Sequence, residues 1–178
     1  MIVAVDVHYS KNDAVAAGVL FQNWADAEVL KEVVVSISPI AEYQPGEFYR
    51  RELPCVMALL DQLKVEPGYL IVDGHVYLDD SHKPGLGKHL YDALQGKVPV
   101  IGVAKRRFRD TPSDSAIFRG KSNRALYVTA AGLDRTAAKG FILQMHGRYR
   151  LPTMLRRADQ LSRSTEPRKG HAVRLKPS

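Results

Sequence analysis

The 178-residue sequence contains one cysteine, Cys55. A single cysteine excludes an intrachain disulfide and a zinc site built from cysteines. No apolar run is long enough to span a bilayer, and no secretory signal peptide precedes the first expected strand. These absences predict a cytoplasmic protein with no membrane partner. The length suits one domain that buries a core of its own.

Acidic residues are scarce at the end of the chain. Residues 146–178 carry 9 lysines and arginines against 2 acids, whereas residues 1–145 carry 17 of each. The final segment therefore supplies the whole net charge of +7, and residues 105–124 form a second basic stretch. Two basic regions favour a polyanionic partner, most commonly nucleic acid. For the C-terminal segment, a solubilising tail is the alternative.

Hydrophobic patterns predict an α/β fold. Three strand-like runs with short connections indicate an antiparallel meander over residues 2–7, 14–21 and 29–37. Helices and strands then alternate: a helix from Pro54, a strand over 69–73, a helix over 87–94, strands over 98–103 and 126–129, and helices over 134–145 and 152–161. This order predicts a mixed sheet with helices on both faces. The domain spans residues 1–163 and is followed by a flexible basic tail, residues 164–178.

Three acids occupy stiff positions that are far apart in the sequence. Asp6 interrupts the first apolar strand, Asp73 ends a later one, and Glu52 lies just before the helix that starts near Pro54. An unpaired carboxylate in an apolar strand is unfavourable, and Mg²⁺ prefers oxygen ligands on rigid elements. The pattern indicates metal-dependent phosphate chemistry. Lys105 ends another strand where it could contact a substrate phosphate; a solvated strand end is the alternative.

Several motifs resemble, in order and spacing, those of the endonuclease V family. They are Val5-Asp6-Val7-His8-Tyr9, residues 43–52 (YQPGEFYRRE), Val72-Asp73-Gly74-His75 and residues 100–105 (VIGVAK), followed by residues 126–129 and 147–152. The resemblance covers residues 2–162. It implies a ribonuclease H-like fold and an endonuclease that uses Mg²⁺, or alternatively Mn²⁺. Such an enzyme recognises inosine or deoxyinosine in RNA or DNA and cuts one nucleotide to its 3′ side.

The resemblance also implies roles for individual residues. Asp6, Glu52 and Asp73 would bind the metal, and Lys105 would lie at the edge of the site. A strand-separating wedge and a pocket for a flipped base would contact the nucleic acid through Tyr43, Pro45, Gly46, Arg51, Gly74, His75, His82 and Lys83. For residues 43–46 an ordinary turn is the alternative, and for His75 a hydrogen-bonded core position.

Two departures from the family pattern concern the candidate site. After residues 126–129 the family has a histidine that completes the metal site, whereas this chain has Gly132-Leu133-Asp134-Arg135. Asp134 is therefore a candidate metal ligand and catalytic residue; the alternative is that it caps the helix beginning there. Val76 replaces a family glycine and is expected to narrow the base pocket. Two other functions stay open: a non-catalytic nucleic-acid-binding relative, and a nuclease that recognises shape rather than base.

Overall fold

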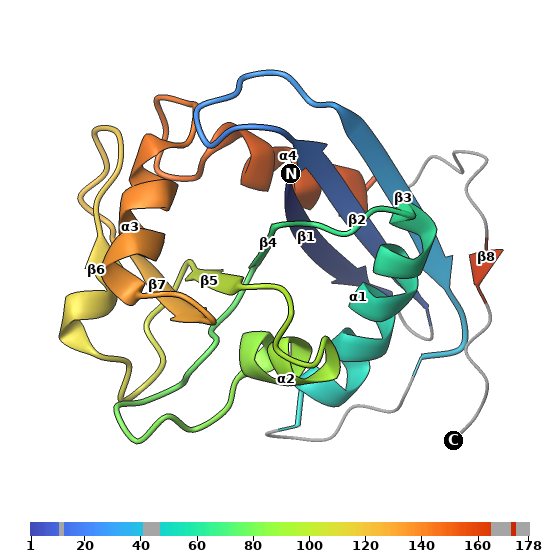
Figure 1. Cartoon of the computed structure of the whole chain (residues 1–178), viewed down its shortest axis with the longest axis horizontal. Coiled ribbons are helices and arrows are strands. Elements are labelled where there is room, and N and C mark those ends of the chain that lie inside the picture. The colour runs from blue at the N-terminus through green and yellow to red at the C-terminus, as the bar shows by residue number, and fades with distance from the viewer. Residues whose placement is uncertain (11–12, 41–46, 165–171, 174–178) are drawn as a thin grey trace.

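A computed structural model describes residues 1–10, 13–40 and 47–164 and the backbone of 172–173. Its centre is one eight-stranded sheet with the strand order β6-β7-β5-β4-β1-β2-β3-β8 (Figure 1). The strands are β1 (Ile2–Tyr9), β2 (Ala14–Phe21), β3 (Lys31–Ile37), β4 (Tyr69–Val72), β5 (Val100–Ala104), β6 (Ala116–Ile117), β7 (Leu126–Ala131) and β8 (Ala172–Val173). Among the described residues, no helix is both long and apolar enough to cross a membrane.

The sheet contains the predicted meander and the predicted parallel strands. Strands β1, β2 and β3 are antiparallel neighbours, and β4 and β5 run parallel to β1. Strands β7 and β6 continue the sheet in the antiparallel sense. Strand β8 lies within the segment predicted to be a flexible tail, yet it pairs in parallel with β3. Residues 165–171 and 174–178 of that tail lie outside the described residues.

Helices cover both faces of the sheet, as predicted (Figure 1). Helices α1 (Tyr49–Leu63) and α2 (Leu86–Ala93) pack on one face, and α3 (Arg135–Gln144) and α4 (Thr153–Ser162) on the other. Because strand side chains alternate between faces, β1 divides its residues between two cores. Val3 and Val5 lie in the core under α1 and α2, whereas Ile2 and Ala4 lie in the core under α3 and α4.

Helix α1 begins earlier than the sequence pattern predicts. It starts at Tyr49, so Pro54 lies inside it and Glu52 belongs to its first turn rather than to the preceding loop. The amides of Arg51 and Glu52 donate to the carbonyl of Phe48 and start the helix. Pro54 has no N–H, so the helix lacks the hydrogen bond from residue 54 to the carbonyl of Arg50. Glu52 is therefore held by a helix, which gives its side chain a more defined direction than a loop would.

The connection from α3 to α4 is fixed by a buried arginine. Arg119 is 6% exposed, and its guanidinium donates to four backbone carbonyls. The acceptors are those of Met145, Gly147 (3.2 Å), Tyr149 (2.9 Å) and Arg150 (3.4 Å). Since this connection leads directly into α4, Arg119 helps to set the position of that helix against β1.

We expect Arg119→Met to lower the free energy of unfolding by about 2–4 kcal/mol, because several buried carbonyls lose a charged donor at once. For a chain of this size the melting temperature should fall by about 5–15 °C. Thermal denaturation followed by circular dichroism measures this. Arg124→Met, which removes an exposed cation from the same loop, is the matched control. An equal melting temperature for the two variants would show that the Arg119 bonds do not stabilise the fold.

Candidate active site

Strand alternation and register bring three of the predicted site residues to one place. In the parallel pair β1–β4, Val5 lies opposite Val72, so the next residues, Asp6 and Asp73, are neighbours. Ile71 and Val103 face the core under α3 and α4, and two residues further along each strand come Asp73 and Lys105. All three polar side chains therefore point to the α4 face at the same edge of the sheet.

Helix α4 adds a third carboxylate, Asp159. One side-chain oxygen from each of Asp6, Asp73 and Asp159 can be chosen so that all three lie within 4.8 Å of one another. Asp159 was not among the residues singled out in the sequence. One signal was present, because Asp159 is one of only two acids after residue 145 and falls in a predicted helix. A lone acid on a helix is usually solvated, however, and only the packing of α4 across β1 directs this one to the cluster.

Asp6 is the most enclosed member of this carboxylate cluster (Asp6, Asp73 and Asp159). It is 8% exposed and accepts a hydrogen bond from the buried hydroxyl of Ser162. Burial raises the pKa of Asp6; the Ser162 hydrogen bond opposes the rise, and the charges of Asp73 and Asp159 add to it. Helix α4 thus supplies one acid of the cluster and also orients another.

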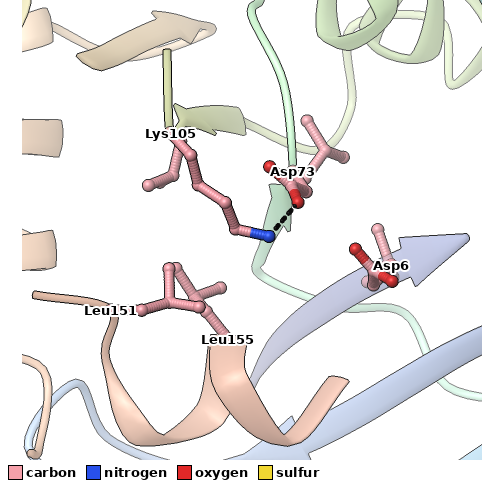
Figure 2. A pocket seen from close by; sticks show the side chains of 8 residues that line it. Asp6, Asp73, Lys105, Leu151 and Leu155 are labelled. Atoms are coloured by element: carbon pink, nitrogen blue, oxygen red, sulfur yellow. Dashed lines mark hydrogen bonds and ion pairs between the residues drawn. The ribbon is translucent and has the colours of Figure 1, made fainter. Parts of the chain in front are cut away.

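Lys105 bridges two of the carboxylates. Its Nζ lies 2.6 Å from Asp73 Oδ2 (Figure 2) and 3.1 Å from Asp159 Oδ1. Burial alone would lower the pKa of Lys105, but the hydrogen bonds and charges of the two acids outweigh burial and raise it. The hollow beside these groups measures about 10 Å³, room for roughly one water-sized sphere, and Leu151 and Leu155 form part of its apolar wall.

Glu52 approaches the cluster from the other helix layer. It is 5% exposed, and among the described residues its Oε2 has no hydrogen-bond partner. Burial raises the pKa of Glu52 well above its usual value, and the charges of Asp6 and Asp73 raise it further. A buried carboxylate oxygen without a partner is costly, and a bound cation is one group that would satisfy it.

These carboxylates fit a hard divalent cation. Mg²⁺ and Mn²⁺ prefer oxygen donors, and the three clustered acids with Glu52 offer only such donors. A metal that prefers thiolate ligands does not fit this set of side chains. Cys55, one turn along α1, is fully buried, and burial raises the pKa of its thiol to about 12, so it stays protonated.

Asp134 does not join this cluster, and its assignment as a metal ligand is wrong. Its exposed carboxylate accepts a hydrogen bond of 3.1 Å from the amide of Ala137 and caps α3. Asp134 follows Ala131, which pairs with Val100, the first residue of β5. Lys105 lies beyond the opposite end of β5. The geometry therefore supports the alternative prediction, a helix cap, and the acid that lies close to Asp6 and Asp73 is Asp159.

The predicted nucleic-acid contacts are only partly assembled around the cluster. Tyr43, Pro45 and Gly46 lie outside the described residues. Gly74 follows Asp73 directly and has a φ of +153° with open space where a Cβ would be. Arg51 stands beside Glu52, and its Cζ lies 4.7 Å from the centre of the Tyr9 ring.

His75 has a partner in the protein. Its Nε2 lies 3.2 Å from the carbonyl oxygen of Arg106. Burial lowers the pKa of His75, although the Arg106 carbonyl and the charge of Asp73 oppose this shift. Its Nδ1 is buried and has no partner among the described residues. The hydrogen bond to a backbone carbonyl supports the hydrogen-bonded alternative for His75.

His82 and Lys83 lie in the loop over residues 76–85, away from the carboxylates. His82 lines a separate open hollow of about 360 Å³ between this loop and the start of α3. Asp134 lines the same hollow. The expectation for Val76 is wrong, because its side chain is fully buried in the core beside α2. Its amide donates to Thr129 Oγ1 at 2.8 Å. Val76 therefore fills core space instead of narrowing a surface pocket.

Comparison with known proteins gives consistent matches. The family model described as Endonuclease V matches residues 1–132. Endonuclease V of Thermococcus kodakarensis is 34% identical over 160 residues, which cover 90% of this chain and 76% of the relative. The crystal structure of endonuclease V from Streptomyces avermitilis has a TM-score of 0.72 at 30% identity and covers 91% of this chain and 79% of that one.

A second solved structure shares the fold at lower identity. Endonuclease V of Ciona intestinalis, in complex with a 23mer DNA containing an inosine followed by a ribo-adenosine, has a TM-score of 0.76 at 18% identity. The match covers 91% of this chain and 83% of that one. At this identity the likeness concerns the fold.

Proposed function

The chain belongs to the endonuclease V family, and on this premise we propose that it is a divalent-metal-dependent endonuclease acting beside deaminated purines in nucleic acid. The enzyme class follows from the family: it is an endonuclease, a hydrolase of phosphodiester bonds. The metal dependence and the preference for inosine or deoxyinosine are the proposal. The observation that carries it is the convergence of Asp6, Asp73 and Asp159 at one edge of the sheet.

Asp6, Asp73 and Asp159 would hold the ion, and Glu52 would reach it from the first turn of α1. We propose Mg²⁺, with Mn²⁺ as a substitute, because four carboxylates form a hard, anionic donor set. When bound, such an ion lowers the pKa of a coordinated water and neutralises charge on the phosphate and the leaving oxygen. The unpartnered Oε2 of Glu52 supports this assignment, since none of the residues that the structure describes satisfies it.

The surrounding residues orient the acids and shield them from water. Ser162 donates to Asp6 and limits its rotation. Lys105 lies beside Asp73 and Asp159, where its ammonium is also available to a phosphate oxygen of a bound strand. Leu151 and Leu155 line the same small hollow and keep it partly apolar, which strengthens the electrostatic interactions inside it.

The substrate assignment rests on the family and on charge. The Ciona intestinalis relative binds inosine-containing DNA, and the net charge of +7 favours a polyanion. The wedge of Tyr43 and Pro45 and the place of Gly46 in the base pocket remain predictions, because these residues lie outside the described residues. The alternative of a non-catalytic relative rests on the missing family histidine, and Asp159 would supply a carboxylate ligand in its place.

The test is cleavage of end-labelled single strands that carry one deoxyinosine (DNA) or one inosine (RNA), beside otherwise identical strands that carry adenine at that position. We expect cleavage only with Mg²⁺ or Mn²⁺, and at least about tenfold faster for the inosine strand, a difference of about 1.4 kcal/mol in the barrier. Asp61→Asn, which removes an exposed carboxylate from α1, should cut like the wild type.

Other outcomes have distinct meanings. Equal cutting of all strands would contradict base specificity and favour a nuclease that recognises shape. Cutting that persists in EDTA would contradict metal dependence. Binding without cutting under any metal condition would favour the non-catalytic alternative.

A further inference from the structure

The connection between α3 and α4 carries an exposed aromatic ring, Tyr149, with two arginines close to it. Tyr149 is 49% exposed. The Cζ atoms of Arg148 and Arg156 lie 5.1 Å and 5.0 Å from the centre of its ring, and Arg148 Nη2 donates to the Tyr149 hydroxyl at 3.0 Å. We refer to Arg148, Tyr149 and Arg156 as the Tyr149 platform. Its planar groups are already arranged against one another by cation–π contacts.

The positive charge of the platform is not neutralised. In the part of the chain that the structure describes, neither Arg148 nor Arg156 forms an ion pair, and neither does the nearby Lys121. Arg157, the next residue along α4, is by contrast paired with Glu32 at 2.5 Å. The platform therefore presents cations that remain available to an external anion.

Two residues join a second loop to this platform. The φ of Gly120 is +60°, and a Cβ at that position would lie 2.3 Å from the carbonyl oxygen of Arg148. Only glycine permits this contact, which brings Lys121 next to the platform. Arg119 donates hydrogen bonds to the carbonyls of Gly147 and Tyr149, the residues on either side of Arg148. Because both loops are tied together, the surface needs little reordering to bind a ligand.

The surface continues into the candidate active site. A wide hollow of about 580 Å³ is lined by Lys121, Ser122, Arg148, Tyr149, Arg150 and Leu151. Among these described lining residues none is acidic. Leu151 also lines the small hollow beside Asp6, Asp73 and Lys105, at the edge drawn in Figure 2. A nucleic-acid strand that places a phosphate at the carboxylate cluster can therefore extend over Leu151 towards Tyr149.

We infer that the Tyr149 platform, with Lys121, binds the single-stranded segment of the substrate that adjoins the cleavage site. This inference rests on the proposed function. An exposed ring stacks on unpaired bases whatever their sequence, and guanidinium groups bind phosphates through charge-assisted hydrogen bonds. A single strand is the favoured ligand, because the base faces of a duplex are already stacked on each other.

Binding is measured by fluorescence anisotropy of a labelled single strand of about 12 nucleotides in EDTA, which prevents metal-dependent cleavage. We expect Tyr149→Ala to weaken binding by about 5- to 100-fold, the effect of losing one base-stacking ring. Tyr149→Phe should bind like the wild type because it keeps the ring. The double variant Arg148→Gln/Arg156→Gln should reduce the slope of log affinity against log salt by about 1–2.

Lys97→Gln is the matched control, because Lys97 is exposed and precedes β5 at the end opposite Lys105. It should change neither affinity nor cleavage, and melting temperatures should agree for all variants. In cleavage assays Tyr149→Ala should raise KM for the inosine strand and leave kcat at saturation unchanged.

Failure of this inference differs from failure of the proposed function. If wild type cuts the inosine strand but the platform variants bind it as tightly as Lys97→Gln, the platform is not a strand-binding surface. A larger loss for a duplex than for the single strand would also overturn the inference. If wild type does not cut, the proposed function fails, while the binding measurements still decide whether the platform holds a strand.

Discussion

Asp159→Asn is expected to lower kcat/KM for an inosine-containing strand by about 10²–10³-fold. Asp159 supplies one of three carboxylate oxygens gathered within 4.8 Å, and loss of its charge weakens the hold on a divalent ion that stabilises the transition state by several kcal/mol. The substitution preserves shape, and the Asp159 carboxylate is partly exposed. The effect should therefore appear in catalysis and metal affinity far more than in folding.

Asp134→Asn is the matched control for this prediction. Asparagine caps a helix about as well as aspartate, so this variant should melt and cut like the wild type. Initial cleavage rates across a Mg²⁺ titration separate the two variants, because Asp159→Asn should require more Mg²⁺ for half-maximal activity. If Asp134→Asn lost activity and Asp159→Asn kept it, the cluster described here would not be the catalytic metal site.

Glu52→Gln is expected to abolish detectable cleavage and at the same time to stabilise the metal-free protein by about 1–2 kcal/mol, the range common for removal of one unfavourable feature. Glu52 is 5% exposed, its Oε2 lacks a partner among the described residues, and Asp6 and Asp73 lie close enough to raise its pKa. The site thus holds a carboxylate that is useful for an ion and unfavourable without one.

The raised pKa of Glu52 predicts that the stability of the protein depends on pH. Burial and the neighbouring acids raise the pKa of Glu52 in the folded state above its usual value of 4.5. Between these two pKa values the folded state binds more protons than the unfolded state, so stability falls as pH rises through this window. The raised pKa of Asp6 acts in the same direction. Metal-free wild type should therefore lose stability above about pH 4.5, and Glu52→Gln should lose less.

Urea denaturation in EDTA at several pH values measures both effects. Glu66→Gln, which changes an exposed acid just beyond α1, should leave the curve unchanged. Addition of Mg²⁺ should stabilise wild type more than Glu52→Gln, because the ion relieves the repulsion that the substitution has already removed. A Glu52→Gln protein that is less stable than wild type at pH 7 in EDTA would mean that Glu52 has a stabilising partner.

Much of the architecture was predictable from the sequence. Strands such as Ile2–Tyr9 and Val100–Ala104 are apolar almost throughout because both of their faces are buried, and this produces a strong local signal. Asp6 and Asp73 were expected to meet only if their two strands were neighbours, and the strand order did not follow from the sequence pattern. The match of the family model to residues 1–132 agrees with the motifs in that part of the chain.

The errors occurred where a local signal had two physical causes. Pro54 suggested the start of a helix, but α1 begins at Tyr49 and continues through Pro54. Asp134 matched both a ligand and a helix cap, and the hydrogen bond from Ala137 decides for the cap. Val76 matched a pocket wall, but the loop folds inward and buries it against α2.

The sequence alone determined the class of this protein: its strands and helices, its basic charge, and acids in stiff positions that suit a metal-dependent nuclease. Only the tertiary structure decided which acids meet. Asp6 and Asp159 are far apart in the chain, and no local pattern reports that α4 packs across β1. The Tyr149 platform also depends on the tertiary structure, because Gly120 and Arg148 come from separate loops that meet only in the folded chain.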